Sequence, residues 1–141
     1  MKKELLNNTQ VKPLILPTVT PVSAGTATTL WLPRTEFMSA IASVAVGAAT
    51  GTPTAQSVVA TVQSAADASG TGAANLLDIE GNAITISLLE DDVSADAGID
   101  LSGAQAFIGL SVVTGFTGGT TPAIPMNAFI ALGDPRDTRN I

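Results

Sequence analysis

The chain has 141 residues, of which 45% are hydrophobic, 4% aromatic and 13% charged, and its formal net charge is −6. It contains neither Cys nor His, which excludes disulfides, thiolate chemistry and the side chain that most often acts as a general base or metal ligand. From Glu36 to Pro135 there are acidic but no basic residues, so this part of the chain cannot neutralise phosphate and is not expected to bind nucleic acid. The length suits one domain with an additional arm.

Residues 1–25 are predicted to form an extended, proline-containing N-terminal arm. Pro13, Pro17 and Pro21 recur in "VKPLILPTVTPVS", and each removes a backbone donor and favours extended geometry in the preceding residue. The arm therefore is not a helix, and it is either an edge segment of its own domain or an arm that reaches a neighbouring molecule. Its apolar side chains are candidate partner contacts: Leu14, Ile15, Leu16 and Val19.

Alternating apolar residues begin at Thr26 and predict about six strands, separated by turns rich in Gly and Pro. Gly118 and Gly119 can adopt positive φ, so we expect a hairpin there that pairs the last two strands. The pattern is typical of an all-β protein, an antiparallel β-sandwich of about six to eight short strands over residues 26–136, with a tail at 137–141. The expected strands cover residues 26–33, 36–48, 56–65, 82–90, 104–114 and 123–133.

Alternate apolar residues share one face of each expected strand. Those of the earlier strands are Met38, Ala40, Ala42, Val44, Val46, Val58, Ala60, Val62, Ile84, Ile86, Leu88, Ala106, Ile108, Leu110 and Val112. In the last strand Met126, Ala128, Ile130 and Leu132 are predicted to face inward. Most of these side chains are small, so we expect a thin core between two sheets.

The densest group of carboxylates lies in residues 90–100, which we interpret as an acidic loop. Calcium binds about six to eight oxygen ligands, but the spacing of these residues matches no calcium-binding loop. A solvated loop and a calcium site are the two alternatives, and the sequence favours the first. The carboxylates are Glu90, Asp91, Asp92, Asp96 and Asp100.

No catalytic residue, cofactor site or metal site is predicted. Ser and Thr are abundant, but no His is present to activate them. The Gly pairs are not followed by the Lys and the helix of a phosphate-binding loop. These observations predict a protein that is not an enzyme.

The low charge content indicates an exterior that is partly covered in an assembly. Charged residues amount to 13%, against about 25% in typical domains. Basic residues cluster near the two ends, beside an acidic body, and this distribution favours contacts with the chain's own body, a sister subunit or an acidic partner. Further candidate contacts are Trp31, Arg34, Arg136 and Arg139.

The first residues, "MKKELLNNTQ", have polar residues where a secretion signal has its apolar core. The least polar stretch, "MSAIASVAVGAA", is shorter than the roughly 20 residues that span a bilayer. We therefore expect synthesis in a cytoplasm and no membrane partner.

Three stretches resemble small structural proteins of tailed bacteriophages: "SVVATVQSAADASG", "IDLSGAQAFIGLSVVTGFTGG" and "TPAIPMNAFIALGDPR". The resemblance covers roughly residues 26–136 and rests on turn chemistry. The shared turns and strand ends correspond to Gln63–Asp67, Leu101–Ala104, Gly118–Gly119, Pro122–Pro125 and Leu132–Arg136.

This resemblance implies a virion structural protein of the capsid decoration, or cement, type. Such a protein would sit on the capsid surface, bind the major capsid protein and form a homo-oligomer, a trimer before a dimer. The host cytoplasm would be its site of synthesis. Alternatives are a neck, tail or fibre component of a phage and a carbohydrate-binding β-sandwich module.

Overall fold

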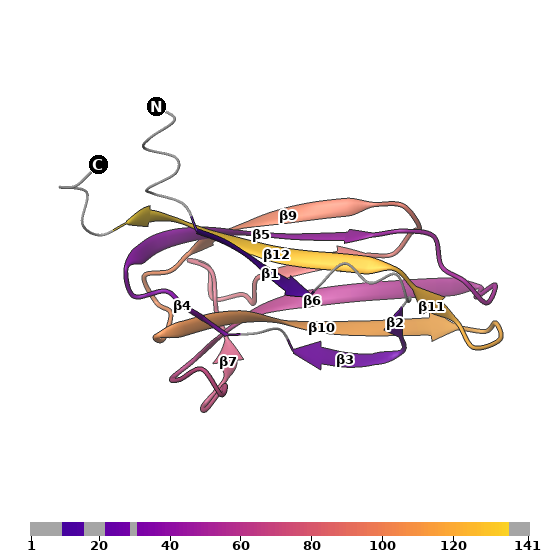
Figure 1. The fold of residues 1–141 in the computed structure, drawn as a ribbon, viewed down its shortest axis with the longest axis horizontal. Helices are drawn as coiled ribbons and strands as arrows, with labels where there is room; N and C mark the ends of the chain where they lie inside the picture. Colours follow the sequence, from indigo (N-terminus) through magenta and orange to yellow (C-terminus); the bar gives the residue numbers. More distant parts are fainter. Residues whose placement is uncertain (1–9, 16–21, 29–30, 136–141) are drawn as a thin grey trace.

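The computed structural model describes residues 10–15, 22–28 and 31–135, and these residues form an antiparallel β-sandwich without helices (Figure 1). This confirms the predicted fold class. The first six strands are β1 (Gln10–Ile15), β2 (Val22–Ser23), β3 (Gly25–Thr28), β4 (Leu32–Pro33), β5 (Phe37–Val46) and β6 (Ala55–Ala65). The others are β7 (Ala74–Asn75), β8 (Thr85–Leu88), β9 (Ser94–Asp100), β10 (Phe107–Thr117), β11 (Ala123–Ile124) and β12 (Met126–Pro135).

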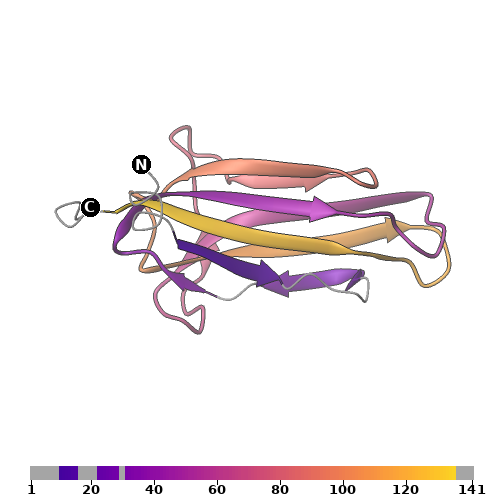
Figure 2. The ribbon, with the colours of Figure 1, turned by 45° about the horizontal axis from the view of Figure 1, so that its top comes forward.

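Two sheets form the layers of the sandwich. The four-stranded sheet has the order β1-β12-β5-β9, and the six-stranded sheet has the order β3-β10-β6-β7. In the six-stranded sheet β4 also pairs with β10, and β8 also pairs with β6. A small pair, β11 with β2, lies beside these layers, and Figure 2 shows the long strands of the two layers running nearly side by side.

The core lies between the sheets and is built from alternate residues of β5, β6, β10 and β12, as period-two patterning dictates. Nearly all residues expected to share the apolar faces are buried, and Ala42, Ala60 and Ile130 are fully so. Met38 is an exception, because it lies near the beginning of β5 and is 55% exposed. Ile84 and Ala106 are half-buried and lie outside the strands.

The predicted hairpin at Gly118 and Gly119 is wrong. β10 and β12 belong to different sheets, and the connection between them crosses from one layer to the other (Figure 1). Both glycines do have positive φ, 70° and 81°, but these backbone angles turn the chain from one sheet to the other instead of forming a hairpin. The connection between β5 and β6 crosses at the same end, and Thr120 N donates a hydrogen bond of 2.8 Å to Gly51 O.

The expected acidic loop is also partly wrong, because residues 94–100 form the edge strand β9. β9 pairs with β5, and Ala97 and Ile99 face inward while Asp96 and Asp100 are exposed. The carboxylates obscured this alternation in the sequence. Charged residues are common on edge strands because they prevent unwanted pairing with other chains.

The part of the N-terminal segment that the structure describes lies on the sandwich. β1 pairs with β12, from Gln10 opposite Leu132 to Ile15 opposite Ala128. β2 pairs with β11, and β3 pairs with β10. Gln10–Ile15 is therefore an edge strand of its own domain, the first of the two alternatives. The candidate contacts Leu16 and Val19, and the side chains of Leu14 and Ile15, lie outside the described part.

Candidate interaction surfaces

The outward face of the six-stranded sheet, here called the neutral face, bears no charged side chain in the strands that the structure describes. One row across it consists of hydroxyl residues in register on four strands: Thr28, Ser111, Thr61 and Thr85. Neighbouring strands are about 4.8 Å apart, so these hydroxyls form a regular row.

A second row on the neutral face is partly apolar. It places Val113 between Thr26 and Val59, with Ser87 on the far side of Val59. Val113 is 48% exposed. A partner that covers this face would bury only methyl groups and hydroxyls. Removing a charged group from water costs more free energy than removing a hydroxyl, and this face avoids that cost.

The outward face of the four-stranded sheet has a smaller apolar area. Ile41 is 53% exposed and Phe129 is 37% exposed. Ile41 pairs with Ala131 and Phe129 pairs with Ser43, so the two large side chains lie on adjacent strands, two residues apart in register. The charged side chains nearest in register are those of Asp96 and Asp100, on the edge strand β9.

Arg34, a predicted partner contact, is buried and bound within its own subunit. Its Nε donates to the carbonyl of Gln105 at 2.8 Å, and its Nη2 donates to the carbonyl of Ala104. The guanidinium thereby joins the segment after β4 to the turn before β10. Arg136 and Arg139 lie outside the described residues.

Trp31 is half-buried and packs against the turn that follows β6. A Cβ atom added at Gly70 would lie 2.6 Å from Trp31 Nε1, so the indole lies directly over this glycine. Gly70 also has a φ of +84°. The indole is thus an anchor for the 66–73 turn.

Two carboxylates of the acidic stretch accept hydrogen bonds, Asp91 from distant segments and Asp100 within a turn. Asp91 Oδ1 accepts hydrogen bonds from Ala49 N at 3.1 Å and from Gln56 Nε2 at 2.6 Å. Asp100 Oδ1 accepts from Ser102 N at 2.9 Å. The backbone amide of Ser102, and then its hydroxyl, lower the pKa of Asp100. Among the residues that the structure describes, no three acidic side chains are grouped to hold a metal ion.

Two further aspartates accept backbone amides within a turn, as Asp100 does. Asp67 Oδ1 accepts from Ser69 N at 2.9 Å and from Thr71 N at 3.1 Å, and the Thr71 hydroxyl is the main reason that the pKa of Asp67 is lowered. Asp78 Oδ1 accepts from Glu80 N and Asn82 N, both at 2.9 Å. Acceptance of backbone amides by the residue that begins a turn is the usual role of Asp in such sequences.

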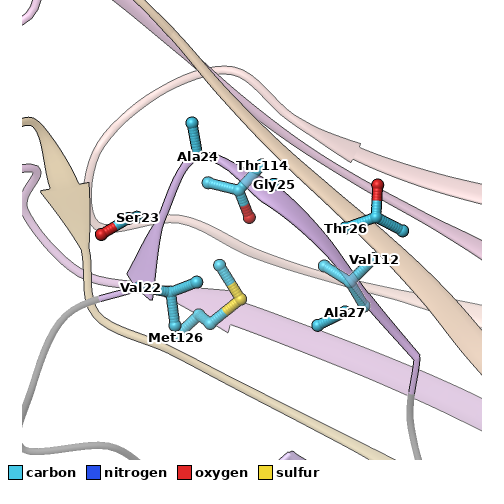
Figure 3. Close-up of a pocket in the computed structure, with 9 residues that line it drawn as sticks. All are labelled: Val22, Ser23, Ala24, Gly25, Thr26, Ala27, Val112, Thr114 and Met126. Atoms are coloured by element: carbon cyan, nitrogen blue, oxygen red, sulfur yellow. The ribbon is translucent and has the colours of Figure 1, made fainter.

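The sequence did not predict two features at opposite edges of the sandwich. At one edge, Ile79 is fully exposed at the tip of the 77–83 loop, beside an open groove of about 600 Å³. At the other edge, β2, β3, β10 and β12 surround a pocket of about 180 Å³ (Figure 3). Residues 76–82, "LLDIEGN", combine apolar residues with turn residues. This combination does not reveal that Ile79 is the side chain that stays in solvent.

Within the described residues, no helix is long and apolar enough to cross a membrane. No protein-family model matches the chain, and no curated protein matches it. Among solved structures, the coat protein of Tobacco streak virus is similar, with 8% identity over 93% of this chain and 90% of that chain, at a TM-score of 0.38. A TM-score of this size does not establish a shared fold or a shared role.

Proposed function

We propose that this chain is a non-enzymatic virion protein that decorates the capsid of a tailed phage and stabilises it by binding across neighbouring major capsid protein subunits. The neutral face is the observation that carries this proposal. Protein interfaces are depleted of charge at their centres, and the neutral face has no charge in any described strand of its sheet.

The neutral face would lie on the shell. Its hydroxyl row offers donors and acceptors to polar backbone and side chains of the shell, and Val113 and Val59 add apolar contact. A single domain would bind the shell with low affinity, but several domains joined in one oligomer would bind neighbouring sites of the lattice with a much higher apparent affinity. A homo-oligomer, preferably a trimer, supplies that multivalency.

The distribution of exposed aromatic side chains gives less support to a carbohydrate-binding module. Sugar sites need aromatic rings at the surface beside polar groups. Of the four Phe residues, only Phe129 is exposed, at 37%, and Trp31 is half-buried against Gly70.

The number of copies in purified virions tests the proposal against a neck or tail role. Quantitative mass spectrometry should find the chain in numbers comparable to the major capsid protein. A few copies per virion would instead mean a neck or tail component, and its absence from virions would overturn the proposal.

Binding to empty expanded capsids of the same phage tests which face is used. Thr61→Lys places a charge in the centre of the neutral face, and Ser43→Lys places the same charge on the four-stranded sheet. Cosedimentation with capsids should be lost for Thr61→Lys and retained for Ser43→Lys. Equal binding of both variants would exclude the neutral face as the capsid contact.

A further inference from the structure

The two long edges of the sandwich carry different charges. The acidic edge consists of β8, β9 and the loops beside them, and β1, β2 and β3 form the opposite edge, here called the pocket edge (Figure 2). In the described ranges 10–15 and 22–28, Lys12 is the one charged residue of the pocket edge. The carboxylates of the acidic edge are Asp78, Glu80, Glu90, Asp91, Asp92, Asp96 and Asp100.

Ile79 projects from the acidic edge on a loop that is held by hydrogen bonds. Asp78 fixes the loop through the two amide hydrogen bonds of its carboxylate, and Asp78 N also donates to Asn82 O at 2.8 Å. Gly81 turns the chain with a φ of +85°. An aliphatic side chain held wholly in solvent gains no burial energy from folding, and a position held by hydrogen bonds lowers the entropy cost of binding a partner.

The pocket edge has a cavity that suits such a side chain. Val112 and Met126, both buried, and Val22 and Ala27 give it an apolar lining, and none of the nine described residues that line it is charged (Figure 3). Its volume is about 180 Å³, whereas an apolar cavity of about 150 Å³ is large enough for benzene. The four carbon atoms of an isoleucine side chain therefore fit.

We infer that a second copy of this chain occupies the pocket, with Ile79 of one molecule inserted between β3 and β12 of the next. Two acidic edges repel each other, so a two-fold contact between them is disfavoured, whereas the acidic edge and the pocket edge of successive copies do not repel. Such a head-to-tail contact forms a ring if its rotation closes. The inference rests on the homo-oligomer of the proposed function and specifies its interface.

Engineered cysteines test this contact directly, because the natural chain has none. Ile79→Cys and Ala27→Cys proteins are mixed under mild oxidation, and mass spectrometry identifies the linked peptides. Leu89→Cys is the matched control, since Leu89 is another exposed aliphatic residue, at 63%. We expect the 79–27 linkage to exceed the 89–27 linkage by at least about tenfold. Equal yields, or a predominant 79–79 linkage, would overturn the head-to-tail arrangement.

Light scattering of the full chain supplies the second measurement. Ile79→Glu should convert the oligomer to a monomer with an unchanged circular dichroism spectrum, and Leu89→Glu should remain an oligomer. A monomeric wild type, or an oligomeric Ile79→Glu, would refute the contact. The copy number in virions is measured separately, so a decoration protein that binds as a monomer would fail these tests while the proposed function stands.

Discussion

The two sheets protect their edges in different ways. The strands that the structure describes in the six-stranded sheet have no charged residue, and its edge strands β3, β4, β7 and β8 have only two to four residues each. The four-stranded sheet has longer edge strands, β1 and β9, of six and seven residues, and these carry Lys12, Asp96 and Asp100. Short strands and charged strands both discourage edge-to-edge association. Because the six-stranded sheet uses short edge strands instead of charged ones, its neutral face carries no charge in the described strands. An uncharged face is suitable for contact with a partner.

The largest expected effect concerns the core that the two sheets share. Leu110 of the six-stranded sheet and Ile130 of the four-stranded sheet are both fully buried. Leu110→Ala and Ile130→Ala should each lower the free energy of unfolding by about 2–5 kcal/mol, as measured by urea denaturation. Val113→Ala, on the neutral face, is the control and should change it by less than about 1 kcal/mol. A much smaller loss for one core variant would show that the two layers do not share one core.

The next effect concerns the two connections that cross between the sheets. A Cβ atom at Gly119, where φ is +81°, would lie 2.6 Å from Gly51 O and 2.9 Å from Pro53 N. Gly119→Ala should therefore destabilise the protein by about 1–3 kcal/mol, measured as a lower Tm. Gly103→Ala, which meets no atom within 4 Å, should leave the Tm nearly unchanged. Equal Tm values for both variants would mean that the crossing connections can separate without cost.

A third effect would appear in association rather than in stability. Asp96→Val removes a charge from the middle of β9 and leaves a more apolar edge strand. We expect light scattering of concentrated samples to show aggregation of this variant, with little change in Tm. Glu90→Val removes a charge outside the strand and should stay dispersed. Aggregation of both variants to the same extent would assign the effect to net charge rather than to the edge strand.

The smallest effect concerns pH. The pKa values of Asp67 and Asp100 are lowered from 3.8 in the folded protein by hydrogen bonds from Thr71 and Ser102. Carboxylates of this kind stabilise the fold above the pKa of the unfolded chain, and the contribution is lost as the pH falls through the folded-state pKa. The Tm of the wild type should thus decrease as the pH is lowered below about 4. The double variant Asp67→Asn with Asp100→Asn should show a shallower fall, and identical slopes would contradict this assignment.

The sequence predicts the sandwich and most of its core because alternation is a local property. Val58, Ala60 and Val62 show their inward face within a few residues. The sequence does not predict the last connection correctly, because a Gly pair allows a hairpin and a crossing equally, and the contact between Gly119 and Gly51 decides between them. Local patterns also do not show that Arg34 binds the carbonyls of Ala104 and Gln105, or that Ile79 remains exposed, because these outcomes depend on distant segments.

The position of β12 between β1 and β5 has a consequence for the order of folding. Gln10 pairs with Leu132 and Phe37 pairs with Pro135, so the four-stranded sheet cannot form its centre until its last-synthesised strand is available. Pairings between residues so distant in sequence are slow to form. Until β12 has been synthesised, the ten uncharged residues of β5, Phe37–Val46, lack this pairing strand. Expression at a lower temperature, which slows synthesis and association, should therefore raise the yield of correctly folded protein.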